Sequence, residues 1–144
     1  NGELWLNEHG PKGGDEINFI EPGKNYGWPV ITYGLEYNGN KIGEGITQKE
    51  GMEQPVYYWD PSVSPSGMDF YTGNAIPEWQ HNLFLGALSG QHIIRLVIKN
   101  NKVAGEERLL ADKGERFRDV LASHQNQSLY AVTDSGKIYR ISKN

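Results

Sequence analysis

Residues 82–103, NLFLGALSGQHIIRLVIKNNKV, and residues 128–141, SLYAVTDSGKIYRI, repeat one plan: an apolar strand, a turn of small residues and a second strand. Residues 3–20, which begin ELWLNEHG and end DEINFI, follow the same plan with a longer connection. Strands at roughly ten-residue spacing with Gly, Asn and Asp turns indicate an all-β fold. No stretch has a convincing helical period.

A strand plan that returns in successive units is typical of the blades of a β-propeller. By this count the chain holds three strands of one blade, a whole four-stranded blade and three strands of another. The corresponding segments are 1–60, which includes a loop-rich stretch and a long irregular excursion, 61–112 and 113–144. The strands expected are 3–7, 16–20, 56–59, 68–71, 82–88, 92–98, 106–110, 117–122, 128–132 and 137–141.

Composition excludes several classes of function. A length of 144 residues with 37% hydrophobic and 11% aromatic residues suits one packed domain. The net charge is −4 and there is no cluster of basic residues, so the sequence offers no positively charged surface for nucleic acid. No run of eighteen apolar residues is present, so no membrane span is expected. The absence of cysteine excludes disulfides and thiolate metal sites.

The stretch that follows the first expected strand has the composition of a binding loop. Residues 9–29 combine glycines, prolines and three aromatic residues with the adjacent carboxylates Asp15 and Glu16. Glycines let the backbone approach a ligand closely, and calcium takes carbonyl and carboxylate oxygens together. A cation site is one interpretation. A solvated β-turn loop with both carboxylates facing water is the other, and spacing alone does not separate them.

Several segments of the sequence resemble a known family, and together they cover nearly the whole chain. HGPKGGDEINFI and PGKNYGWP, followed by SPSGMDFYTGNAIPEWQHNLFLGAL, EERLLADKGERFRDV and SLYAVTDSGKIYRI, closely resemble the soluble aldose sugar dehydrogenases. These belong to the glucose and sorbosone dehydrogenase-like family, which are six-bladed β-propellers that depend on pyrroloquinoline quinone (PQQ). The resemblance implies the C-terminal half of an oxidoreductase that converts aldose sugars at C1 to lactones, in a periplasmic or secreted location.

The resemblance also implies where calcium and sugar bind. Glu16 and Tyr26, the latter through its backbone carbonyl, match the family's calcium ligands. The backbone oxygens of Gly10 and Pro11 match those that hold the ion bridging to PQQ, and Tyr37 fits the place of a tyrosine that contacts sugar.

Two further segments match the family's cofactor contacts. Arg116, Phe117 and Arg118 lie at its Arg-x-Arg position, and in a strand the two arginines would project to one face and reach one anion. Without the resemblance, a pair of surface arginines would be the better interpretation.

The second cofactor segment departs from the family pattern. Ala87, Leu88 and Ser89 match it, but relatives carry a lysine where Ser89 stands. Losing this lysine removes a positive charge beside the quinone carboxylates.

In the family the general base is a histidine of the N-terminal half, outside these 144 residues. The resemblance therefore implies that the chain alone is inactive. It further implies association with the missing half, or with a second copy, through open blade edges. A non-catalytic propeller module that binds carbohydrate or protein is the alternative function.

Overall fold

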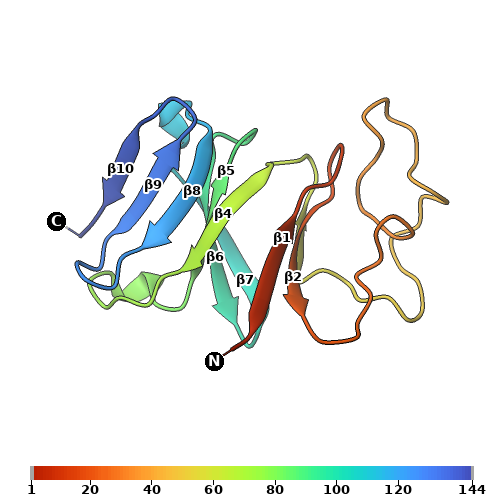
Figure 1. Cartoon of the computed structure of the whole chain (residues 1–144), viewed down its shortest axis with the longest axis horizontal. Helices are drawn as coiled ribbons and strands as arrows, with labels where there is room; N and C mark the ends of the chain where they lie inside the picture. The colour runs from red at the N-terminus through yellow and green to blue at the C-terminus, as the bar shows by residue number, and fades with distance from the viewer. Residues whose placement is uncertain (1, 144) are drawn as a thin grey trace. The chain divides into compact units, whose positions relative to one another are not determined.

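Short β-strands supply the regular structure of this chain, which we describe from a computed structural model of residues 2–143 (Figure 1). The strands are β1 (Leu4–Glu8), β2 (Asp15–Ile20), β3 (Tyr57–Trp59), β4 (Pro65–Phe70), β5 (Leu83–Ala87), β6 (His92–Lys99), β7 (Lys102–Leu109), β8 (Phe117–Ala122), β9 (Leu129–Thr133) and β10 (Ile138–Ile141). Two 3₁₀ turns, η1 (Pro77–Trp79) and η2 (Ala111–Lys113), accompany them. The prediction of an all-β chain is confirmed.

The strands form three antiparallel sheets in sequence order. Their strand orders are β1-β2-β3, β4-β5-β6-β7 and β10-β9-β8, which gives the predicted series of three, four and three strands. The first sheet belongs to a structural unit that ends at Ser64, and the other two belong to a unit that begins at Pro65.

The first unit combines its small sheet with the long excursion between β2 and β3. The excursion has isolated bridges but no strand, as its composition predicted. Ile31 and Ile42 are buried within it, and the Thr32 amide donates to the Ile46 carbonyl over 3.1 Å. The excursion therefore has buried apolar residues and a backbone hydrogen bond of its own.

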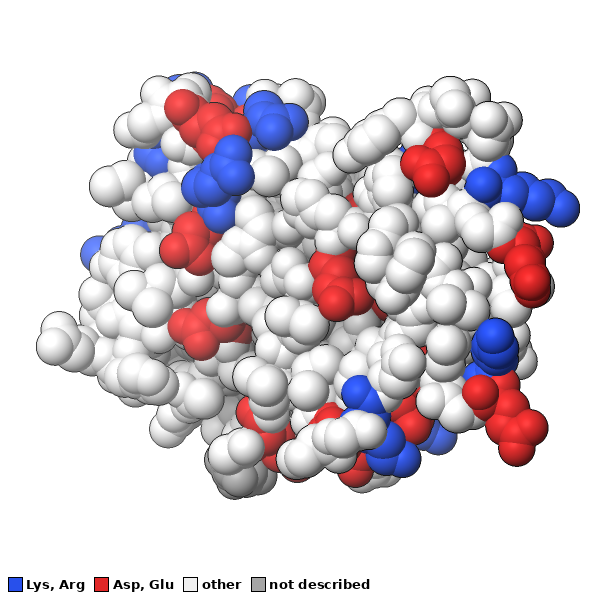
Figure 2. Space-filling model, turned by 45° about the vertical axis from the view of Figure 1, so that its right-hand side comes forward, with Lys and Arg blue, Asp and Glu red and all other residues white. Residues whose placement is uncertain are grey.

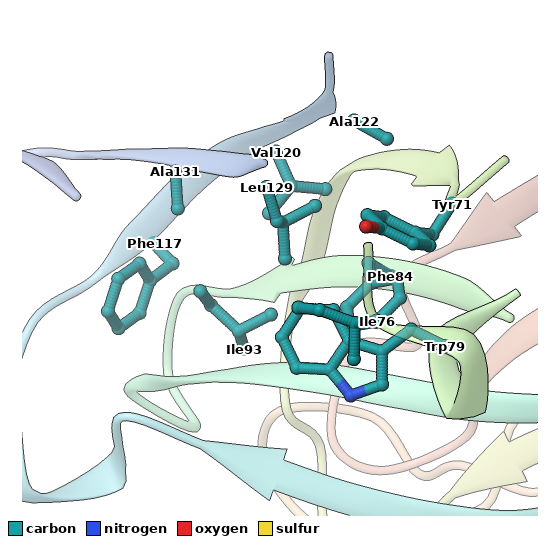
Figure 3. Close-up of a cluster of buried hydrophobic side chains, with 10 residues drawn as sticks. All are labelled: Tyr71, Ile76, Trp79, Phe84, Ile93, Phe117, Val120, Ala122, Leu129 and Ala131. Atoms are coloured by element: carbon teal, nitrogen blue, oxygen red, sulfur yellow. The ribbon is translucent and has the colours of Figure 1, made fainter. Parts of the chain in front are cut away.

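The second unit packs its two sheets through one hydrophobic core (Figure 3). Alternating side chains of β8 and β9 face the nearly continuous apolar strands β5 and β6, so aromatic and aliphatic residues of both sheets meet. The core residues are Tyr71, Ile76, Trp79, Phe84, Ile93, Phe117, Val120, Ala122, Leu129 and Ala131.

Hydrogen bonds between these two sheets fix their alignment. The Ala122 amide donates to the Asp69 carboxylate over 2.8 Å, and the Ser66 hydroxyl donates to the Phe117 carbonyl over 2.8 Å. The start of β8, where the sequence carries its paired arginines, is therefore held against β4.

Two strand boundaries differ from the sequence prediction by more than one residue. The strand expected at residues 68–71 already begins at Pro65 as β4, where Pro65 pairs with Ala87. Proline tolerates the first position of a strand. β7 begins at Lys102, four residues before the predicted strand, because it pairs with β6 from Lys99 onward. Pairing with a neighbour decided both boundaries.

Figure 2 shows acidic and basic side chains interspersed on the visible face. Within residues 2–143, no helix has the length and apolar character that crossing a membrane would require.

Candidate functional site

Asp15 organises the loop between β1 and β2. Its Oδ1 accepts from the Gly10 amide over 2.8 Å and from the Ser62 hydroxyl over 3.1 Å. Its Oδ2 accepts from the amides of Val63 and Ser64 over 2.8 and 2.7 Å. Both oxygens of this fully buried carboxylate are thus engaged by the protein, so Asp15 holds the loop in place instead of serving as a cation ligand.

The interpretation of a solvated loop is wrong for this stretch. Asp15 and Glu16 lie on strand β2, and their side chains are buried. Gly14 explains how the loop packs: it has a φ of 75°, and a Cβ there would collide with the backbone amide of Gly34. Only glycine fits this close approach of two backbones.

Glu16 is a desolvated carboxylate with an amide partner. Only 8% of the residue is exposed, and its Oε2 accepts from the Asn18 Nδ2 over 3.1 Å. Burial raises the pKa of Glu16; the Asn18 hydrogen bond opposes this rise, and the nearby Glu8 carboxylate adds to it. A cation bound here would favour the ionised form and offset the burial.

A cavity of about 210 Å³ opens beside this carboxylate. Its lining includes Glu8, His9, Gly10, Glu16 and Tyr26, so three of the four residues predicted to hold calcium border one space. His9 also lines the cavity. Pro11, the fourth predicted ligand, is half-buried and is not among the residues that line it.

Tyr26 is fixed by its hydroxyl. The hydroxyl donates to the Phe19 carbonyl over 2.7 Å and accepts from the Glu21 amide over 2.8 Å. The side chain is thereby occupied, which leaves the backbone carbonyl as the ligand that Tyr26 could offer. Tyr37 lies apart from this cavity on the excursion and is 81% exposed.

The residues around the cavity fit a hard cation. Glu8 and Glu16 are direct cross-strand partners, and Oδ1 of the fully buried Asn18 has no hydrogen-bond partner. Carboxylate and amide oxygens are the ligands that calcium prefers. Within residues 2–143 there is no group of three or more His, Asp or Glu side chains placed to hold a metal, so a cation here would also need backbone oxygens or water.

The second unit carries the predicted arginine pair. Nε of Arg116 donates to Asp134 Oδ2 over 3.0 Å, while Arg118 donates from Nε to Oδ1 over 2.8 Å and from Nη2 to Oδ2 over 3.1 Å. Both guanidinium side chains are about half exposed. The two arginines thus share one anion, which in this structure is a protein carboxylate.

The charges at this cluster reinforce one another. The hydrogen bonds from Arg118 and then Arg116 lower the pKa of Asp134, and the Asp134 carboxylate raises the pKa of Arg118. The cluster keeps a net positive charge, because two guanidinium groups share one carboxylate. It can therefore attract a further anion.

The other residues predicted to contact the cofactor are mostly buried. Phe117, Ala87 and Leu88 belong to the core, with exposures of 0, 0 and 5%, so any contact they make with a ligand would come from the backbone. Ser89 is exposed on the turn between β5 and β6. The His92 ring lies 2.6 Å from the Gly90 carbonyl through Nδ1, which braces this turn.

Sequence reasoning missed three residues of these clusters: Glu8, Asn18 and Asp134. The signal for the first two was the two-residue period, because Glu16 and Asn18 share a strand face and Glu8 lies opposite Glu16 once β1 and β2 pair. Asp134 follows from the pairing of Phe117 with Thr133, which brings the next turn to Arg116.

Comparison with known proteins places the chain in a family. Residues 1–140 match the Glucose / Sorbosone dehydrogenase family. The aldose sugar dehydrogenase YliI of Escherichia coli K12 is 47% identical over 142 residues, which are 96% of this chain and 38% of that protein. The chain therefore belongs to the glucose/sorbosone dehydrogenase family and spans about two fifths of the length of the relatives it matches.

Solved structures agree with this assignment. A crystal structure of a glucose dehydrogenase matches all of this chain and 42% of its own, with a TM-score of 0.93 and 45% identity. The PQQ-bound form of an aldose sugar dehydrogenase from Streptomyces coelicolor matches 91% of this chain and 34% of its own, with a TM-score of 0.66 and 27% identity.

Proposed function

We propose that this chain is part of a PQQ- and calcium-dependent dehydrogenase that oxidises aldose sugars at C1. The observation that carries the proposal is the shared arginine pair of the second unit. Arg116 and Arg118 are held in a defined orientation by Asp134 while about half of each side chain stays exposed. PQQ is a tricarboxylate, and its recognition requires fixed cations of this kind.

The proposal also includes the second predicted cofactor segment, residues 87–89. Ala87 and Leu88 would meet the cofactor through their backbone, since their side chains are buried. Ser89 would offer a hydroxyl where relatives have a lysine. When bound, PQQ supplies a quinone that accepts a hydride, and this chain's residues bind and orient it.

Calcium belongs to the first unit in this proposal. Glu16, the Tyr26 carbonyl and the backbone of Gly10 border one cavity and would hold the ion. Pro11 would contribute its carbonyl from outside that lining, and Tyr37 would contact the sugar with its exposed ring.

The chain supplies only part of the activity in this proposal. The family's base lies elsewhere in the polypeptide, so we expect calcium- and PQQ-dependent dye reduction with glucose to be negligible for these 144 residues alone. Association with the N-terminal half, or self-association, would be needed, and the whole protein would work in the periplasm or outside the cell.

A titration of PQQ into the purified chain tests the proposal. Four tryptophans report binding by fluorescence quenching: Trp5, Trp28, Trp59 and Trp79. We expect saturable quenching with calcium that is lost when calcium is chelated. Absence of quenching in both conditions would contradict the proposal. It would favour the second candidate, a carbohydrate- or protein-binding module, for which the 81% exposed Tyr37 and the 57% exposed Trp28 are suited.

A further inference from the structure

The pairing of β1 with β2 opposes two carboxylates. Glu8 and Glu16 are partners in the antiparallel register, and Asn18 follows Glu16 by two residues. Directly opposed residues project to the same face of a sheet, as do residues two apart in one strand. All three side chains therefore gather on one face, at the end of the strand pair that leads into the loop of residues 9–14.

This arrangement is unfavourable without a counter-charge. Like charges that face each other across an antiparallel pair destabilise it, and Glu16 is largely removed from water, with 8% of the residue exposed. Glu8 is half-buried. The group that bridges the two carboxylates is the neutral amide of Asn18, whose Nδ2 lies 3.1 Å from Glu16 Oε2 and 3.4 Å from Glu8 Oε2.

Asn18 itself is incompletely satisfied. Its side chain is fully buried and its Oδ1 has no hydrogen-bond partner, which is rare for a buried polar atom. A rotation of the amide by half a turn would exchange the positions of its nitrogen and oxygen. The oxygen would then lie between the two carboxylates and complete a set of three oxygen-bearing side chains, which is a ligand set for a hard divalent cation.

We propose that Glu8 is the second carboxylate of the cation site centred on Glu16, and that the Asn18 amide bridges both carboxylates without the ion and turns its oxygen to the ion when it is bound. The cavity beside them, lined by both glutamates, gives the ion room and water access. This inference rests on the proposed calcium site at Glu16 and adds to it a ligand and a positioning residue.

Calorimetric titration of CaCl₂ into the 144-residue chain tests the role of Glu8. We expect Glu8→Gln to weaken calcium binding by about tenfold to a hundredfold, the range found when a partner at a metal site is removed. Glu44→Gln makes the same change of charge at an exposed position of the same unit and should leave the affinity unchanged. Equal affinities of the wild type and Glu8→Gln would overturn the assignment.

Thermal unfolding separates a ligand from a structural residue. In chelator, Glu8→Gln should be at least as stable as the wild type, because it relieves the repulsion between opposed carboxylates. In calcium the order should reverse, because only the wild type gains the full stabilisation from the ion. A loss of stability in both conditions would show that Glu8 has a structural role only.

Asn18→Asp tests the amide. A third carboxylate should tighten calcium binding, because affinity in oxygen sites rises with ligand charge, and it should lower stability in chelator. Unchanged binding would overturn the role given to Asn18.

Glu16→Gln distinguishes the two proposals. If it abolishes binding while Glu8→Gln leaves the affinity unchanged, the inference fails and the proposed site stands. If the wild type binds no calcium, the proposed calcium site itself fails.

Discussion

Arg118 grips Asp134 at two points: its Nε donates to Oδ1 over 2.8 Å and its Nη2 to Oδ2 over 3.1 Å. Such a paired geometry fixes the plane of the guanidinium group, which a single contact does not. Arg116 adds a third hydrogen bond to the same carboxylate. The arginine pair is therefore oriented before any ligand binds, and the Asp134 carboxylate neutralises one of its two positive charges.

Replacing Arg118 by lysine should weaken PQQ binding. An ammonium group keeps the charge but cannot make the two-point contact, so we expect the affinity measured by tryptophan quenching to fall about tenfold. Arg108→Lys is the matched control, because Arg108 is similarly exposed and also pairs with one carboxylate, that of Glu106. If the two variants changed the affinity equally, the effect would not come from the arginine pair.

The Asp134 cluster should make stability depend on pH. The arginines lower the pKa of Asp134 in the folded chain, so its contribution is fully present above the ordinary aspartate pKa of about 4 and is lost as the pH falls through the lowered value. The urea midpoints of the wild type and Asp134→Asn should therefore differ above that range and converge in acid. High salt should shrink the difference. A difference that stays constant through the acid range would contradict this prediction.

Asp15→Asn should destabilise the first unit. Oδ2 accepts from the Val63 and Ser64 amides, and Oδ1 accepts from Gly10. An amide nitrogen placed at either position would face N–H donors. We expect a loss of about 3 kcal/mol in the free energy of unfolding, because a buried donor without a partner costs about 1–3 kcal/mol. Urea denaturation measures the loss.

The control for this variant is Asp112→Asn, at an aspartate whose side chain is 71% exposed and pairs only with Lys113 in the contacts described. Surface pairs contribute little, so this change should leave the urea midpoint where it was. A midpoint for Asp15→Asn equal to that of the control would show that the four hydrogen bonds to Asp15 are dispensable.

The fold could be predicted because strand periodicity and turn residues are local. In β8, Val120 and Ala122 are buried two residues apart, as the period of a strand requires, whereas Phe117 reaches the core across a register shift between Phe117 and Asp119. The candidate sites could be predicted only in part. The placing of Glu8 opposite Glu16 depends on the register of two strands, which the sequence does not state.

Loop contacts were beyond the reach of the sequence for the same reason. Asp15 accepts from residues 62–64, across a separation of 47 to 49 positions. The composition of the surrounding loop suggested that Asp15 is a cation ligand, but three of the four groups that donate to its oxygens come from a distant segment. Similarly, Phe117 matched a cofactor-binding pattern, and only the packing of two sheets showed that its ring is buried.

Gly86→Ala should destabilise the contact between the two sheets of the second unit. A Cβ at this position would lie 2.5 Å from the Ser66 hydroxyl and 2.6 Å from the Phe117 carbonyl, the two groups that join β4 to β8. Forcing a methyl group into such a contact costs about 1–3 kcal/mol. Gly105→Ala in the same sheet is the control, because its nearest neighbour would be Val97 Cγ2 at 3.9 Å. We expect urea unfolding to show the loss for Gly86→Ala alone. Two equal losses would mean that the cost arises from glycine replacement in a strand and not from the contact between sheets.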